Sequence, residues 1–170
     1  MSVRSVLPVI ELRIADGTVC GIQGGGDLNM KIQSTTNSSV IPTLRYRDGQ
    51  AAIDWLCKAF GFKVQLVVPD KSGAIAHAQL VYGNGMIMLG SATNNEFHTI
   101  VKSPAETGGI GSQSAYIIVA DVDDHYKMAV AAGAEIVIDI KEEDYGGRAY
   151  SCRDPEGHVW NFGSYDPWSA

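Results

Sequence analysis

Apolar and polar positions repeat one pattern twice along the chain. Between residues 49 and 60, apolar side chains recur three and four positions apart, which is the spacing of an amphipathic helix. Gly61 follows as a typical helix-ending residue. Strand-like runs surround this helix, at 40–46, 62–68, 75–82 and 85–89. Residues 40–91 therefore predict the order strand, helix, strand, strand, strand.

The same order follows a long loop at 92–112. A helix over 123–132, ended by Gly133, is predicted among strands at 115–119, 134–140, 148–152 and 158–163. The two halves align at a constant offset of 73 residues, which places Asp48 on Asp121. We therefore expect an α+β fold built from two tandem modules, residues 40–91 and 114–165.

Residues 1–39 lie outside the repeat. They contain two strand-like runs on either side of Gly17, then a triple glycine, and the polar stretch at 33–39 is typical of a linker. We expect an N-terminal hairpin or a flexible leader over 1–39, with Met30 as an alternative start of the working protein. The domain proper would then span 40–165, and 166–170 would form a C-terminal tail.

Composition and charge disfavour several classes of protein. The 170 residues carry 13 Lys and Arg against 19 Asp and Glu, a formal charge of −6. This balance disfavours nucleic acid and anionic membranes as partners and would suit a cationic ligand. No run approaches the roughly 18 apolar residues of a membrane helix, and no signal peptide is evident, so we expect a cytoplasmic protein. Three Cys without paired spacing indicate neither a disulfide framework nor a zinc site.

Four segments of the repeat carry a resemblance to a known family. They are IPTLRY at 41–46, AIDWL at 52–56, AHAQL at 76–80 and DPEGHVWNF at 154–162. With them, residues 40–165 resemble the vicinal-oxygen-chelate superfamily of glyoxalases, bleomycin-resistance proteins and extradiol dioxygenases, in particular its glyoxalase-like or bleomycin-resistance-like branch. The resemblance implies two βαβββ modules that form a curved mixed sheet around a cavity, which a homodimer often completes.

Many members of that superfamily bind a divalent metal through one residue from each of four strands. The resemblance places these positions at Ile41 and Met88 in the first module and at Ser114 and Asn161 in the second. Ile has no donor atom, the Met thioether suits soft Cu(I), and Ser and Asn are weak neutral donors. We therefore predict no metal site and no cofactor, so the metal-dependent chemistry of glyoxalase I is not expected.

Side chains alternate across a strand, so the cavity wall can be predicted from the same positions. Pairing Gln79 with Met88 would turn His77 toward the cavity and the apolar residues at 76, 78 and 80 toward the helix. The offset of 73 then adds Tyr150 and Cys152 to the cavity face. The predicted ligand-binding residues are Thr43, Arg45, His77, Gln79, Met88, Ser114, Tyr116, Tyr150 and Asn161.

Three functions are compatible with this wall. The first is a metal-free binding protein for a small organic molecule, since the wall mixes apolar and polar side chains. The second is an isomerase or lyase in which His77 is the general base and Arg45 anchors an anion, although a half-buried strand histidine is also typical of a structural role. The third is an oligomeric interaction protein with a vestigial pocket. Trp160 is expected in the core, and His158 is expected to stabilise the closing hairpin.

Overall fold

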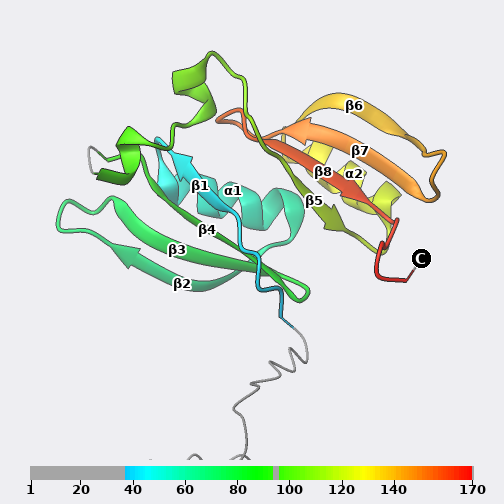
Figure 1. Ribbon diagram of the computed structural model, residues 1–170, viewed down its shortest axis with the longest axis horizontal. Helices are drawn as coiled ribbons and strands as arrows, with labels where there is room; N and C mark the ends of the chain where they lie inside the picture. The colour runs from blue at the N-terminus through cyan, green and yellow to red at the C-terminus, as the bar shows by residue number, and fades with distance from the viewer. Residues whose placement is uncertain (1–36, 94–95, 170) are drawn as a thin grey trace, which may run out of the picture. The chain divides into compact units, whose positions relative to one another are not determined.

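The computed structural model describes residues 37–93 and 96–169, which belong to one compact unit of the chain. The predictions for residues 1–36, including the hairpin and Met30, lie outside the described residues. Figure 1 shows two similar halves, each a sheet with one helix against one of its faces. The segment that links the halves contains two short 3-10 helices, η1 (Glu96–Thr99) and η2 (Pro104–Thr107).

The first module has the predicted order of elements. They are β1 (Thr43–Tyr46), α1 (Gly49–Phe60), β2 (Lys63–Pro69), β3 (Ile75–Tyr82) and β4 (Gly85–Ser91). The sheet has the order β1-β4-β3-β2, with β1 parallel to β4 and the other pairs antiparallel. The predicted pairing of Gln79 with Met88 is confirmed, and Ala78 and Leu80 are fully buried on the helix side. Ala76 is exposed instead, because a register irregularity near the start of β3 interrupts the alternation.

The second module repeats this arrangement. Its elements are β5 (Ala115–Ile118), α2 (Val122–Ala131), β6 (Glu135–Glu142), β7 (Arg148–Arg153) and β8 (Val159–Gly163). The sheet has the order β5-β8-β7-β6, and β5 is parallel to β8. The predicted α+β fold of two tandem modules is therefore confirmed, with a four-stranded mixed sheet in each module.

Both helices begin at an aspartate that caps the first turn. The Asp48 carboxylate accepts a hydrogen bond from the Ala51 N–H at 3.0 Å, and the Asp121 carboxylate accepts one from the Asp124 N–H at 2.9 Å. Such caps satisfy N–H groups that have no partner within the helix. Gly61 ends α1 in the left-handed conformation, at a φ of 75°. No helix in the described part of the chain has the length and apolar character needed to span a membrane.

The constant offset of 73 holds for the helix starts and for β8, but it does not hold for β6 and β7. Lys63 pairs with Val81 in the first module, and Glu135 pairs with Arg153 in the second, so these strands lie at an offset of 72. The turn between β7 and β8 holds one residue more than its counterpart and restores the offset. Because side chains alternate along a strand, a shift by one residue moves every side chain of β7 to the other face.

Tyr150 and Cys152 therefore face the helices, and their predicted orientation toward the cavity is wrong. Tyr150 is 1% exposed and its hydroxyl lies 2.7 Å from Nδ1 of His125 on α2, while Cys152 has no exposed surface. Ser151 takes their place on the opposite face of β7, where it stands across from Asn161. The shorter connection before β6 is the physical reason, because it changes the parity of both following strands.

The buried carboxylate of Asp154 joins the two modules. One of its oxygens accepts the Tyr46 hydroxyl of β1 at 2.6 Å and the Trp160 indole N–H at 3.0 Å. The other accepts the backbone N–H groups of Glu156 and His158, each at 3.0 Å, which shapes the turn between β7 and β8. Trp160 is 1% exposed, so its predicted place in the core is confirmed. A single carboxylate thus folds its own turn and holds the end of β1.

Two further residues of this turn hold the first module. The Glu156 carboxylate accepts the backbone N–H groups of Arg47 and Asp48 at 2.7 and 2.9 Å. His158 donates from Nε2 to the carbonyl oxygen of Arg45 at 2.8 Å. His158 therefore stabilises more than its own hairpin, because its side chain binds a strand of the other module.

The two helices contact each other through one ring and one carbonyl in each direction. Trp55 of α1 donates from Nε1 to the carbonyl oxygen of Ala132 at 2.9 Å, and His125 of α2 donates from Nε2 to that of Phe60 at 3.2 Å. With Nε2 donating, a neutral His125 accepts the Tyr150 hydroxyl at Nδ1. Burial lowers the pKa of His125 because the charged ring would lose its hydration, and the hydrogen bond to Phe60 only partly opposes this.

Replacing Tyr46 by Phe removes one donor to the buried Asp154 carboxylate and keeps the ring. We expect the free energy of unfolding to fall by about 1.5 to 3 kcal/mol, the usual worth of a hydrogen bond to a charged group, as measured by urea denaturation. Tyr126→Phe is the matched control, because the Tyr126 hydroxyl donates at 2.8 Å to the exposed Asp139 carboxylate. Its loss should stay below about 1 kcal/mol. Equal losses in the two variants would contradict the role given to Asp154.

The free energy of unfolding should decrease as the pH falls below about 6.5. A histidine whose pKa is lowered by folding binds protons more readily in the unfolded chain. Its contribution is therefore complete above the unfolded pKa and is lost as the pH falls toward the folded pKa, by at most about 1.4 kcal/mol per pH unit. Urea denaturation of His125→Gln over the same pH range should give a shallower dependence than the natural chain. The same slope in both proteins would show that His125 does not contribute.

Candidate functional site

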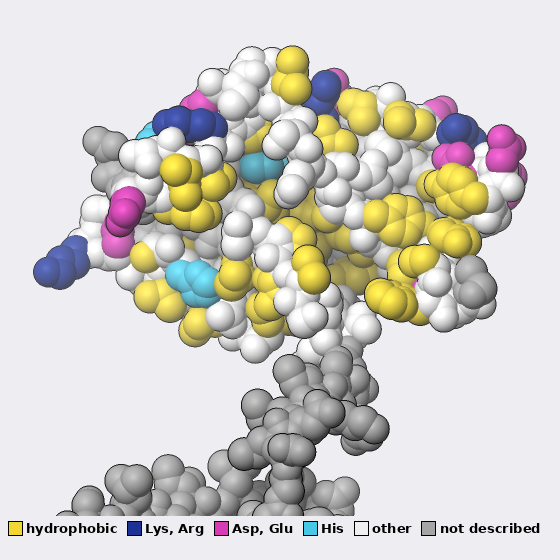
Figure 2. All heavy atoms as spheres, viewed as in Figure 1, with side chains coloured by type: hydrophobic (Ala, Val, Ile, Leu, Met, Phe, Trp, Pro, Cys, Tyr) yellow, Lys and Arg dark blue, Asp and Glu magenta, His cyan; other side chains and the backbone are white. Residues whose placement is uncertain are grey.

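A groove of about 790 Å³ runs between the two modules. Its walls are residues 40–45 leading into β1, residues 110–115 leading into β5, the start of β8 at 158–160, and parts of the linking segment at 100–107. A volume of this size is typical of pockets that hold a small organic ligand. In Figure 2, hydrophobic and uncharged side chains occupy the middle of the viewed face, and most charged side chains lie toward its rim.

The groove wall combines apolar surface with positive charge. Apolar side chains along it are Ile41, Leu44, Ile100, Val101, Ile110 and Val159. Arg45 and Lys102 also line it, and no Asp or Glu is among its lining residues, all of which lie in the described part of the chain. Lys102 is 42% exposed and pairs with Glu106 at 3.5 Å. The groove therefore has the opposite sign to the whole chain, whose formal charge is −6.

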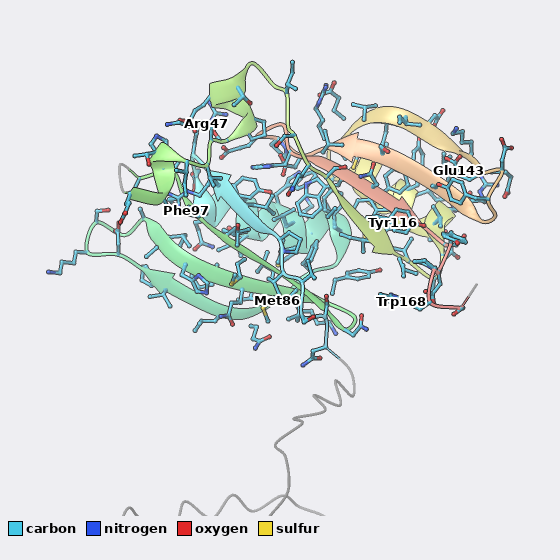
Figure 3. All side chains as sticks on the ribbon, in the orientation of Figure 1. Arg47, Met86, Phe97, Tyr116, Glu143 and Trp168 are labelled. Carbon is cyan, nitrogen blue, oxygen red and sulfur yellow. The ribbon has the colours of Figure 1, made fainter. Side chains whose placement is uncertain are left out.

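Arg45 lies beneath the linking segment with nearly all of its side chain out of solvent. It is 7% exposed, and its guanidinium carbon lies 5.7 Å from the centre of the Phe97 ring, which η1 supplies (Figure 3). A Cβ built on Gly90 of β4 would stand 3.3 Å from Nη1, so the glycine leaves room for Arg45 on the sheet. The Nε and Nη2 atoms are buried and have no hydrogen-bond partner within residues 37–93 and 96–169.

The other predicted residues of the first module form a row across its sheet. Thr43, Met88, Gln79 and Leu66 stand opposite one another on β1, β4, β3 and β2, on the face away from α1. His77 lies near this row, with its Nε2 3.1 Å from the side-chain nitrogen of Gln79. Because an amide nitrogen can only donate, this Nε2 accepts. Thr43 lines the groove, whereas His77, Gln79 and Met88 do not.

A matching row crosses the second sheet. Tyr116, Asn161, Ser151 and Ile138 stand opposite one another on β5, β8, β7 and β6. The Asn161 amide donates to the Ser114 hydroxyl at 2.8 Å and to a main-chain carbonyl at 3.0 Å, and it accepts the Ser151 hydroxyl at 2.7 Å. Ser114 lines the groove, whereas Tyr116 and Asn161 do not. The sequence did not point to Ser151, because the constant offset placed its neighbours on this face.

The structure therefore divides the predicted wall among the groove, the two sheet faces and the core. Tyr150 and Cys152 belong to the core, where burial raises the pKa of the Tyr150 hydroxyl and raises that of the Cys152 thiol to about 12. A thiol with so high a pKa is not a nucleophile near neutral pH. Lys102 and the apolar residues at 100, 101 and 110 were not predicted, because the loop at 92–112 has no periodic pattern that would place it.

Comparison with known proteins gives a family. Residues 38–162 match the Glyoxalase/Bleomycin resistance protein/Dioxygenase superfamily. The chain belongs to this superfamily. An uncharacterized protein of Mycobacterium bovis is 30% identical to it over 122 residues, which cover 72% of this chain and 80% of that protein.

Solved structures of the superfamily share the fold. TioX from Micromonospora sp. ML1 is 35% identical, with a TM-score of 0.60 over 75% of this chain and 98% of that one. A glyoxalase-related enzyme from Fulvimarina pelagi is 18% identical, with a TM-score of 0.57 over 74% of this chain and 86% of that one. The fosfomycin resistance protein FosX from Mesorhizobium loti is 13% identical, with a TM-score of 0.52 over 78% and 95% of the two chains. The last two similarities concern the fold alone.

The superfamily's metal positions do not fit a divalent ion in this chain. Ile41 has no donor, Met88 offers only a thioether, and Ser114 and Asn161 are neutral and bind each other at 2.8 Å. Among the described residues there is no group of three or more His, Cys, Asp or Glu side chains that could hold a metal ion. No chemical step is therefore assigned to a metal.

We expect the sheet faces to bind no stoichiometric divalent metal, because they present a thioether and an amide where the superfamily uses imidazole and carboxylate. The measurement is elemental analysis of the full chain after dialysis against nickel, zinc or ferrous salts. Asn161→Ala serves as the control that locates any bound ion. About one ion per chain that disappears in Asn161→Ala would contradict the assignment of this face.

Proposed function

We propose that this protein binds a small organic molecule in the groove between its modules and that binding does not use a metal ion. The observation that carries the proposal is the groove of about 790 Å³, which is walled mainly by apolar side chains with few polar groups among them. Ligand pockets typically combine apolar area, which supplies affinity, with a small number of polar groups, which fix orientation. The superfamily's description includes resistance proteins, which agrees with a binding role.

The polar groups of the groove suit recognition better than catalysis. Thr43, Gln113 and Ser114 offer hydroxyl and amide groups that can donate or accept hydrogen bonds. Of the titratable residues that line it, Arg45 and Lys102 are cations, and His158 is held by its hydrogen bond to the Arg45 carbonyl. Nucleophilic catalysis needs a nucleophile beside a base, and these lining residues do not provide such a pair.

The enzyme alternative with His77 and Arg45 has less support. His77 lies outside the groove, and its Nε2 is occupied by the Gln79 amide. A general base must reach the proton that it removes, and a ligand in the groove would not meet His77. We therefore favour binding over turnover.

A homodimer remains part of the proposal. Four apolar side chains on the sheet faces away from the helices are more than a third exposed: Leu66, Val68, Ile118 and Ile138. Exposed apolar faces of this kind are typical of surfaces that a partner covers. Sedimentation of the full chain would decide, since a monomer at all concentrations would count against it.

Narrowing the groove should weaken binding. Gln113→Trp places a large ring at an exposed position of the groove wall, and Gln65→Trp makes the same change on the exposed surface of β2, outside the groove. With 2-naphthamide and related bicyclic aromatic amides and carboxylates as probes, we expect saturable binding of one molecule per chain by isothermal calorimetry. Gln113→Trp should weaken it at least fivefold, or about 1 kcal/mol, and Gln65→Trp should leave it unchanged. No saturable binding of any probe, or equal affinities in the two variants, would contradict the proposal.

A further inference from the structure

We infer that the ligand of this groove is an organic anion whose carboxylate, or a similar oxyanion, binds the Nε–Nη2 edge of Arg45. The inference rests on the proposed function, because it names the chemical class of the ligand for the same groove. The observations that carry it are the two unpartnered donors of a buried arginine and the absence of carboxylates from the groove wall.

The two unpartnered atoms form the edge of the guanidinium that matches a carboxylate. Nε and Nη2 lie on the same side of the planar group, so their N–H bonds can point in parallel at two oxygens of one carboxylate. Both atoms are closed to solvent and have no acceptor among residues 37–93 and 96–169. A buried charged donor without an acceptor is costly, so an incoming oxyanion would gain two charge-assisted hydrogen bonds.

Phe97 does not replace such an acceptor. Its ring stabilises the positive charge of Arg45 through a cation–π contact at 5.7 Å, but a ring face offers no lone pair to an N–H donor. Because Nε and Nη2 are closed to solvent, a ligand reaches them only after the Arg45 or Phe97 side chain turns. Phe97 is 39% exposed, and its rotation would not disturb the core.

The surrounding charges favour an anion at this place. The groove is lined by Arg45 and Lys102 and by no Asp or Glu, although the chain as a whole carries a formal charge of −6. A concentration of one sign in a cleft attracts ligands of the opposite sign and repels those of the same sign. The expected ligand is therefore an apolar body that carries one negative group, which differs from the cationic ligand that the net charge alone would suit.

The test compares two probes of nearly the same shape, 2-naphthoate and the neutral 2-naphthamide, on the full chain at constant ionic strength. We expect the natural chain to bind the carboxylate about tenfold to a hundredfold more tightly than the amide. Arg45→Met should lose this preference while it keeps its affinity for 2-naphthamide, which also shows that the variant is folded. Phe97→Ala should keep the preference. Lys102→Met should lower it less than about threefold, because an exposed ammonium contributes little.

Equal affinities of the natural chain for the two probes would overturn the inference and leave the proposed function intact. A preference that survives in Arg45→Met would overturn it as well. If neither probe binds, the proposed function fails, and the anion site is decided by titrating the natural chain with acetate. The Nε–H NMR signal that is missing in Arg45→Met should then shift saturably with acetate and not with chloride. The absence of such a shift would overturn the inference on its own.

Discussion

Asp154 accepts hydrogen bonds from both modules, and the groove depends on this contact. Its carboxylate is 4% exposed and satisfies the Tyr46 hydroxyl on one side and the turn backbone on the other. Hydrogen bonds to a buried charge are strong, and removing one partner leaves the others without compensation. The same turn adds Glu156, which holds the backbone at Arg47 and Asp48. The motif at 154–162 therefore fixes the position of β1 against the second module.

This contact also explains where a ligand can bind. With the end of β1 held by the turn before β8, the segments that lead into β1 and β5 stand on two sides of a groove, and the linking segment lines it further. Arg45 lies at the junction, since its carbonyl receives His158 and its side chain lies under Phe97. The site that the structure supports thus arises between the modules, whereas the superfamily's metal positions at Met88 and Asn161 lie on the sheet faces.

The prediction of the second cavity face failed at one residue. The β3–β4 pairing of Gln79 with Met88 could be deduced, because a two-residue turn leaves a hairpin little choice of register. The position of β7 was deduced from a constant offset, and the connection from α2 to β6 is one residue shorter than that offset requires. The difference of one residue exchanged Tyr150 and Cys152 for Ser151. Gly61 and Gly133, which are 72 residues apart, were the signal that could have shown it.

The sequence by itself determined the two modules, their element order and the helix caps, because these follow from periodicity and from short-range hydrogen bonds such as that of Asp48 to Ala51. It also determined that the superfamily's metal positions lack suitable donors, since donor chemistry belongs to the residue type. Only the tertiary structure decided that Arg45 is buried with two free donors and that residues 100–115 form a groove without carboxylates. Burial and local charge depend on which distant segments meet, and a loop without periodic pattern gives no indication of where it will pack.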